Sequence, residues 1–216
     1  MPSLREQTES QFAKLRQNKP EFASQVDVIL TSAEMVEKGS HAIALGQQAP
    51  QFTLPNAGGE VVSLTQLLDS GPVVVTFYRG SWCPYCNLQL RAMQSRLTDI
   101  HALNAKLVAI SPQMPDASLS QDERETLAFP VLSDQDARVA TEYGVAWEVP
   151  EIFLEHMRKD RNLELAEING GSGSVLPIPA TFVLNRDRVV TWRFVNVDYR
   201  LRAEPDDILA ALQKLS

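Results

Sequence analysis

The chain has 216 residues, of which 44% are hydrophobic and 22% charged, a balance typical of a globular protein with one large domain or one domain and an appendage. Its net charge of −7 argues against a nucleic-acid-binding protein, whose surface would be basic. No stretch reaches the roughly 18 apolar residues of a membrane span, and residues 1–16 lack the apolar centre of a signal peptide. We therefore expect a cytoplasmic protein with neither membrane nor nucleic-acid partners.

Two helices are predicted before the first strand. Apolar residues recur at helical spacing between residues 22 and 36, and a shorter helix is predicted over residues 3–17. Gly39 is a suitable end for the second helix. We interpret residues 1–40 as an N-terminal helical arm, which packs either on the main domain or on a second copy of the chain in a homodimer.

The remaining residues, 41–216, alternate between strand and helix patterns. Strands are predicted at residues 52–54, 61–64, 72–78, 106–110, 129–132, 180–184 and 189–195. Helices are predicted at residues 83–104, 117–127, 135–143 and 205–215. An irregular insertion at about 145–176 contains a charged helical stretch over residues 150–161 and a Gly/Ser run at 170–174. This order predicts an α/β fold, with a mixed central sheet that helices cover on both faces.

The chain has only two cysteines, Cys83 and Cys86, at the point where a buried strand gives way to a helix. Cysteines this close cannot staple distant segments, as those of a secreted scaffold do. A disulfide between them closes too small a loop to constrain the unfolded chain much. A zinc site needs about four ligands, and the sequence offers no second cysteine pair. We therefore expect redox chemistry that uses no metal and no cofactor.

The position of each cysteine on the helix predicts its role. Backbone N–H groups and the macrodipole at a helix N-terminus favour a thiolate, which is the nucleophilic form. Pro84 suits the first helical turn, and Ser81 is expected to supply the N-cap oxygen. Cys86 belongs to the core-facing stripe of the helix, so we expect Cys83 to be the more exposed sulfur that attacks and Cys86 the one that resolves. The stripe continues through Leu90, Met93, Leu97 and Ile100.

Residues 77–86, which read Phe-Tyr-Arg-Gly-Ser-Trp-Cys-Pro-Tyr-Cys, resemble the active-site segment of the thioredoxin superfamily. Trp-Cys-x-x-Cys looks like thioredoxin, and Cys-Pro-Tyr-Cys is also the glutaredoxin motif. A wider resemblance points to the peroxiredoxin-like proteins of the alkyl hydroperoxide reductase/thiol-specific antioxidant family. It is carried by residues 49–54, 62–64, 108–112 and 129–134. The resemblance implies a thioredoxin-like fold for the main domain and an antioxidant, thiol-dependent peroxidase activity.

The same resemblance suggests a substrate-binding surface. Ile178 and Pro179 are similar to the loop that carries a cis-proline in thioredoxin folds. By this likeness we expect a cis bond before Pro179, opposite the cysteines, where it would shape the substrate groove. The other expected substrate-binding residues are Ser81, Trp82, Pro84 and Tyr85.

Three departures from the family pattern affect the expected chemistry. Typical peroxiredoxins have Thr or Ser three residues before the attacking cysteine and Pro seven before it, but this chain has Gly80 and Thr76. They also carry an arginine from a later strand, for which the sequence identifies no counterpart. Thioredoxins carry a buried Asp near the position of Thr76. We expect Arg79 to lower the pKa of Cys83 and to polarise the peroxide, with Ser81 as a second donor at a shifted position.

The leading hypothesis is a peroxidase that reduces hydrogen peroxide or organic hydroperoxides. Cys83 would become a sulfenic acid, and Cys86 would condense with it to a disulfide. A reductant of thioredoxin, glutaredoxin or glutathione type would then reduce that disulfide. One alternative is a thioredoxin- or glutaredoxin-like oxidoreductase acting on protein disulfides. Another is a redox sensor that switches a partner protein through the arm or the 145–176 segment.

Overall fold

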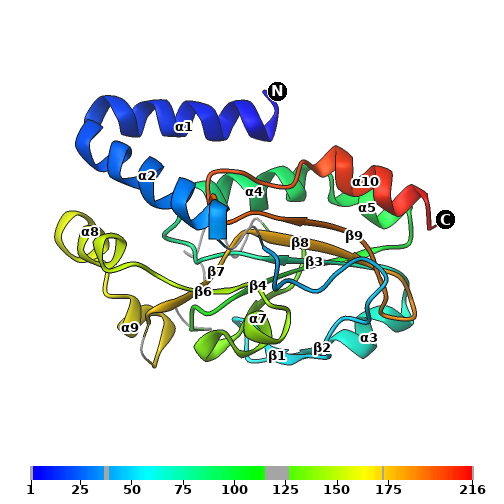
Figure 1. Cartoon of the computed structure of the whole chain (residues 1–216). Helices are drawn as coiled ribbons and strands as arrows, with labels where there is room; N and C mark the ends of the chain where they lie inside the picture. Colours follow the sequence, from blue (N-terminus) through cyan, green and yellow to red (C-terminus); the bar gives the residue numbers. More distant parts are fainter. Residues whose placement is uncertain (1, 37–38, 115–126, 172, 216) are drawn as a thin grey trace.

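A computed structural model of the chain describes residues 2–36, 39–114, 127–171 and 173–215 (Figure 1). At its centre lies a five-stranded sheet in the order β5-β4-β3-β8-β9. The strands are β3 (Val73–Phe77), β4 (Lys106–Ser111), β5 (Val131–Ser133), β8 (Ala180–Leu184) and β9 (Val190–Val195). β4 runs parallel to β3 and β5, whereas β8 is antiparallel to both β3 and β9. The sheet is therefore mixed, as predicted.

Helices cover the sheet on both faces because its central strands bury both sets of alternating side chains. Every residue of β3 is buried. Val74 belongs to one core, while Val75 and Phe77 belong to the other. Figure 1 shows α4 (Pro84–Ser95), α5 (Leu97–Ala102) and α10 (Pro205–Gln213) on the first face, and α3 (Leu64–Asp69) and α7 (Arg138–Glu142) on the second. The first core contains the cysteines.

The strands predicted at residues 52–54 and 61–64 are present as β1 (Thr53–Pro55) and β2 (Val61–Ser63), which pair antiparallel. Helix α3, which follows at once, was not among the predicted elements. Its start has a capping box, in which the Ser63 hydroxyl accepts from the backbone of Gln66 and the Gln66 side chain bonds back to Ser63. The Ser-x-x-Gln spacing of residues 63–66 was the sequence signal that could have predicted the start of this helix.

Both predicted helices of the arm are present, as α1 (Leu4–Asn18) and α2 (Pro20–Val36). α1 lies beside α4 of the same chain (Figure 1). The backbone N–H of Arg5 donates to the Glu204 carboxylate at 2.7 Å. Asp27 pairs with Arg16 at 3.0 Å and with Arg200, from the segment before α10, at 2.6 Å. The described contacts therefore hold the arm on its own main domain.

The segment at 145–176 is more regular than predicted. It consists of β6 (Ala146–Glu148), α8 (Glu151–Arg161), α9 (Leu165–Asn169) and β7 (Val175–Pro177). α8 confirms the charged helix expected over residues 150–161. β6 and β7 pair antiparallel, and Phe153, Met157 and Leu165 are buried in the first core. The two strands have only three residues each, too short for an alternating pattern to be recognised.

Two other predicted helices differ in the structure. The helix expected over residues 83–104 is broken at Arg96, whose backbone angles (φ −110°, ψ 9°) end α4 and precede α5. The one expected over 135–143 begins as a 3₁₀ turn, Gln135–Ala137, followed by α7. The helix predicted at 117–127 lies almost entirely outside the described residues. Within the described ranges, no helix combines the length and apolarity that a membrane crossing requires.

The bond before Pro179 is trans, so the prediction of a cis-proline was wrong. The residues on either side of this bond are held by backbone hydrogen bonds. Ile178 donates its N–H to the carbonyl of Val145 at 2.9 Å, and the Pro179 carbonyl accepts from Asn196 at 3.2 Å. Pro179 lies at a bend between β7, which pairs with β6, and β8 of the central sheet.

Candidate active site

The Cys-Pro-Tyr-Cys motif lies where β3 ends and α4 begins, as predicted. Cys83 is the N-cap residue of α4 and Pro84 its first helical residue. No side-chain hydrogen bond caps this helix, so the prediction that Ser81 would do so was wrong. Instead the Ser81 hydroxyl accepts from the side chain of Gln113 at 3.2 Å, and the Ser81 N–H donates to the Gln113 side-chain oxygen at 2.8 Å. Gln113 thus holds the loop before the motif.

Gly80 allows that loop to turn tightly. Its φ of +146° lies in a region that residues with a side chain rarely adopt. A Cβ at this position would stand 2.4 Å from the indole nitrogen of Trp82, which is too close. Glycine here therefore fits the close fold of the loop over the cysteines, and the threonine or serine of the family pattern would not.

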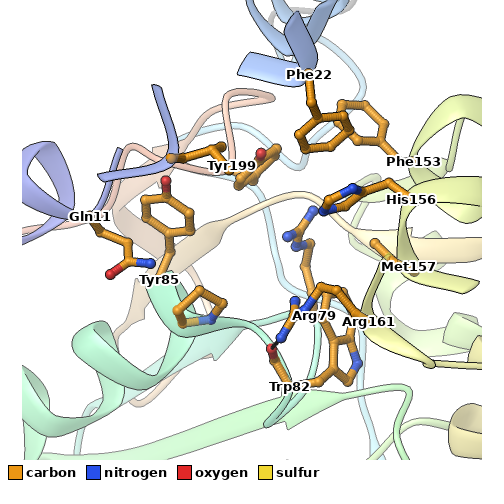
Figure 2. A pocket seen from close by; sticks show the side chains of 12 residues that line it. Gln11, Phe22, Arg79, Trp82, Tyr85, Phe153, His156, Met157, Arg161 and Tyr199 are labelled. Carbon is orange, nitrogen blue, oxygen red and sulfur yellow. Dashed lines mark hydrogen bonds between the residues drawn. The ribbon is translucent and has the colours of Figure 1, made fainter. Parts of the chain in front are cut away.

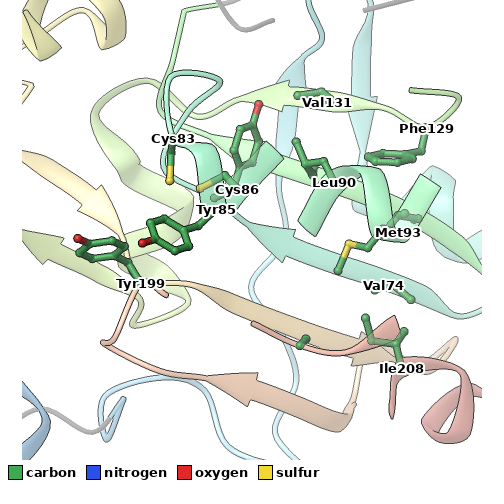
Figure 3. Packing of buried hydrophobic residues seen from close by; sticks show 14 of the residues in the cluster. Val74, Cys83, Tyr85, Cys86, Leu90, Met93, Phe129, Val131, Tyr199 and Ile208 are labelled. Atoms are coloured by element: carbon green, nitrogen blue, oxygen red, sulfur yellow. The ribbon is translucent and has the colours of Figure 1, made fainter. Parts of the chain in front are cut away.

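Both sulfurs are buried, with Cys83 and Cys86 each 0% exposed. The prediction that Cys83 would be the more exposed sulfur was wrong. Figure 3 shows the two cysteines beside the rings of Tyr85 and Tyr199, at the end of the first core. The two rings pack edge to face with centroids 5.5 Å apart. The buried stripe of α4 and α5 that begins at Cys86 agrees with the sequence pattern.

Two guanidinium groups contact the sulfurs. Arg79 donates from Nη2 to Cys83 Sγ at 3.5 Å. Arg202 lies 3.4 Å from Cys86 Sγ and 4.0 Å from Cys83 Sγ, measured from its Nη2. That same nitrogen donates to the carbonyl of Tyr199 at 2.7 Å. Arg79 is held in place by aromatic faces, since its guanidinium carbon lies 4.1 Å from the centre of the Tyr199 ring.

This charge distribution separates the pKa values of the two thiols. Burial would raise the pKa of Cys83, but the hydrogen bond from Cys86 and the charges of Arg79 and Arg202 outweigh it and hold that pKa well below its ordinary value. Burial and the neighbouring Cys83 raise the pKa of Cys86 well above its ordinary value, against the opposing charge of Arg202. The pair can therefore hold one thiolate on Cys83 while Cys86 keeps its proton.

A buried polar network fixes Arg202. Its Nη1 donates to Gln89 Oε1 at 3.0 Å. Gln89 Nε2 in turn donates to Thr76 Oγ1 at 3.1 Å and, less closely, to Thr181 Oγ1 at 3.4 Å. The two threonine hydroxyls are 2.9 Å apart. The network ties α4 to β3 and β8 and gives Thr76, at the position where the family pattern has proline, a hydrogen-bonding role.

A cavity of about 380 Å³ lies in front of the cysteine loop, between that loop, the arm and α8 (Figure 2). Arg161 closes it on one side, where its guanidinium donates to the Trp82 carbonyl at 2.7 Å. Phe22 of the arm stacks on His156 of α8, with ring centroids 3.7 Å apart. The other described residues that line the cavity include Arg79, Trp82, Pro84, Tyr85, Phe153, Met157 and Tyr199.

The structure brings together only some of the predicted site residues. Arg79, Trp82, Pro84 and Tyr85 line the cavity, but Ile178 and Pro179 are not among its described lining residues. The Ile178 side chain belongs instead to the core on the opposite face of the sheet. Within the described residues, no three His, Cys, Asp or Glu side chains converge as a metal ion would require.

Sequence reasoning missed the second arginine and its support. Arg202 is 119 positions after Cys83, in the segment between β9 and α10, and nothing in its neighbourhood marks it as buried. Tyr199 and Gln89 likewise carry no local signal. One available hint was the family's later-strand arginine, but Arg202 follows the last strand instead of lying on it.

The fold and the site together define a thioredoxin-like protein with a buried dithiol centre. The chain belongs to the AhpC/TSA family, whose model matches residues 45–193. Arg202 and the arm lie outside the matched stretch.

Named relatives and a solved structure agree with this assignment. Over 103 residues, the chain is 36% identical to a putative peroxiredoxin of Mycobacterium tuberculosis (strain CDC 1551 / Oshkosh), covering 48% of this chain and 65% of that protein. It is 32% identical over 100 residues to peroxiredoxin Bcp of Escherichia coli (strain K12), covering 46% of this chain and 64% of that protein. The match thus spans less than two thirds of either relative. The crystal structure of peroxidoxin BcpB from M. tuberculosis superposes with a TM-score of 0.61 at 24% identity, covering 81% of this chain and 99% of that one, which shows the shared fold.

Proposed function

We propose that the protein is a thiol peroxidase in which Cys83 attacks the peroxide and Cys86 resolves the product. The observation that supports this most directly is the position of Cys83 Sγ between Arg79 and Arg202, with its pKa lowered while that of Cys86 is raised. The names of the relatives, which are peroxiredoxins, point the same way.

The chemistry follows from these positions. The Cys83 thiolate attacks the outer oxygen of R–O–O–H, so that an S–O bond forms, the O–O bond breaks, and RO⁻ leaves and takes up a proton. Cys83 is thereby oxidised to a sulfenic acid and the peroxide is reduced to an alcohol or water. The Cys86 thiol then attacks the sulfenic sulfur, and the displaced hydroxide leaves as water with the Cys86 proton. A thiol reductant of thioredoxin, glutaredoxin or glutathione type restores the dithiol.

The guanidinium groups stabilise charge at two moments. Before the reaction they stabilise the thiolate, and during it Arg79 is placed to donate to the leaving oxygen, on which negative charge develops. Typical peroxiredoxins have a threonine or serine three residues before the attacking cysteine, where this chain has Gly80, which has no side-chain donor. The guanidinium groups provide electrostatic support in place of that hydroxyl.

Rates with two kinds of oxidant test the proposal. We would measure second-order rate constants for hydrogen peroxide and for a small disulfide, in the wild type and in Arg79→Met, which keeps an apolar stem against Tyr199. We expect the substitution to slow peroxide reduction by more than tenfold and disulfide exchange by less, because a thiolate leaving group needs less stabilisation. If peroxide reacts with the wild type no faster than with a free thiol of matched pKa, the protein is instead a disulfide oxidoreductase.

A further inference from the structure

The two arginines of the site contact the two sulfurs unequally. Arg202 Nη2 lies 3.4 Å from Cys86 Sγ and 4.0 Å from Cys83 Sγ. Arg79 Nη2, in contrast, donates to Cys83 Sγ at 3.5 Å. The attack on peroxide needs a thiolate on Cys83 alone, and Arg79 already stabilises it there. The position of Arg202, closer to the other sulfur, therefore suits a later step of the reaction.

Both guanidinium groups are buried without a carboxylate. Arg79 and Arg202 are each 7% exposed, and within the described residues no ion pair joins either of them to Asp or Glu. A buried charge without a counter-ion costs free energy. In the reduced protein, the Cys83 thiolate supplies the negative charge that faces both groups. This compensation ends when Cys83 reacts, because a sulfenic acid is neutral.

The loss of the Cys83 thiolate changes the electrostatics of Cys86. Burial raises the pKa of Cys86 most, and the hydrogen bond and the charge of Cys83 raise it further, whereas the charge of Arg202 lowers it. When Cys83 is neutral, its thiolate no longer opposes a second negative charge. Arg202 keeps its place, because it donates to Gln89 at 3.0 Å and to the Tyr199 carbonyl at 2.7 Å. The pKa of Cys86 then falls from its raised value.

We propose that Arg202 is a catalytic residue of the second step, in which it stabilises the Cys86 thiolate that attacks Cys83. The inference rests on the proposed function, because that step follows the reaction with peroxide. Cys86 loses its proton, its sulfur attacks the sulfenic sulfur, an S–S bond forms and the S–O bond breaks. The displaced hydroxide takes up a proton and leaves as water. The Cys86 sulfur is thereby oxidised, and the Cys83 sulfur is reduced from sulfenic acid to disulfide.

The second step can be measured without peroxide. Methyl methanethiosulfonate, a small thiol reagent, should convert the Cys83 thiolate to a methyl disulfide at mildly acidic pH, where Cys86 keeps its proton. A jump to higher pH then starts the attack by Cys86, which closes the disulfide and releases methanethiolate. Acid quenching and mass spectrometry follow the loss of the methylthio group. Cys86→Ser should keep that group, which verifies that the reagent reacted at Cys83.

Arg202→Lys and Arg202→Gln form a matched pair, because both lose the guanidinium and only the lysine keeps a positive charge. An opposite charge within about 4–6 Å lowers the pKa of an acid by about one or more, which changes the thiolate fraction about tenfold. Arg202→Gln should therefore close the disulfide about tenfold more slowly than the wild type at neutral pH, with a rate that levels off only at higher pH. Arg202→Lys should close it faster than Arg202→Gln.

Two controls separate the charge of Arg202 from the folding of its loop. Arg200→Met changes the same loop at a residue that pairs with Asp198 and Asp27, and it should close the disulfide at the wild-type rate. The wild type needs no variant that folds. Its closure rate should level off at a lower pH than the one at which Cys86 ionises in the reduced protein, measured by thiolate absorbance. Levelling at or above that pH would overturn the inference.

The matched pair gives the decisive comparison. Equal closure rates for Arg202→Lys and Arg202→Gln would overturn the inference, because Arg202 would then act only through its hydrogen bonds. So would an Arg200→Met variant that is slowed as much as Arg202→Gln. If hydrogen peroxide does not react with the wild type while the methyl disulfide closes as expected, the proposed function fails and Arg202 activates Cys86 in disulfide exchange. If peroxide reacts normally while closure does not depend on Arg202, only the present inference fails.

Discussion

The polar network beneath the cysteines is buried, whereas the contact between the arm and α8, on the other side of the cavity, includes exposed side chains. Beneath, Gln89, Thr76 and Thr181 are at most 1% exposed, and their hydrogen bonds join core elements. Above, the arm meets α8 through side chains that are partly in water, such as Lys19 and Asp160, each 42% exposed. A buried polar group that loses its hydrogen-bond partner costs folding free energy, whereas an exposed ion pair contributes little to stability. Arg202 is thus held through buried hydrogen bonds, whereas the ion pair between the arm and α8 is exposed and contributes little to stability.

The largest expected effect comes from the reactive sulfur itself. Cys83→Ser should abolish peroxide turnover, because no other thiol is poised to attack. Cys86→Ser should still consume about one peroxide per chain and then stall as sulfenic or overoxidised cysteine. Measuring how much peroxide each variant consumes in a single turnover, and then the mass of the protein product, distinguishes Cys83→Ser from Cys86→Ser. Loss of the single turnover in Cys86→Ser would reverse the roles of the cysteines.

Removing the second guanidinium should have the next largest effect. We expect Arg202→Met to lower the second-order rate constant with hydrogen peroxide by about a hundredfold, within the range seen when one preorganised donor to a developing charge is lost. Arg200→Met, in the same loop, removes a guanidinium that pairs with Asp198 and Asp27. The control should lose some stability and keep most of the rate. Equal losses of rate would show that the loop matters only for folding.

Loosening the buried network without touching a charge should have an intermediate effect. Gln89→Leu removes the acceptor for Arg202 and should slow peroxide reduction by about tenfold, with a raised pKa for Cys83, because the guanidinium is no longer aimed at the sulfurs. Thr181→Val removes a more distant member of the network and should cost stability with little change in that pKa. If both variants shift the pKa equally, Gln89 does not position Arg202.

The smallest effect on stability and rate is expected at the contact between the arm and α8. Lys19→Gln removes the ion pair between the arm and Asp160 of α8, which are 2.9 Å apart. We expect only a slight fall in the urea midpoint, which shrinks further at high salt because salt screens exposed charges. The rate with hydrogen peroxide should stay within twofold. A large loss of stability would mean that the arm is held as firmly as the core.

The sequence predicted the features that depend on local patterns, and it missed those that depend on contacts between residues distant in sequence. The central strands, α4 and the place of the motif followed from apolar periodicity and from the spacing of Cys83 and Cys86. The burial of Cys83 did not, because its cover comes from residues remote in sequence, such as Tyr199. Arg202 was missed for the same reason. Pro179 was expected to be cis by resemblance, but the bond before it is trans, and its surroundings come from Val145 and Asn196, which are distant in sequence.

The most direct test of the account is a pH titration of thiolate ultraviolet absorbance in Cys86→Ser, in which only Cys83 can ionise and the introduced serine still offers a hydroxyl. Because a lowered pKa keeps the thiolate at neutral pH, the absorbance should persist there and disappear only as the pH falls through that value, well below the roughly 8.5 of a free thiol. In Cys83→Ser, the signal of Cys86 should appear only in the alkaline range. A Cys83 that titrates at or above 8.5 would contradict the claim that Arg79 and Arg202 outweigh its burial.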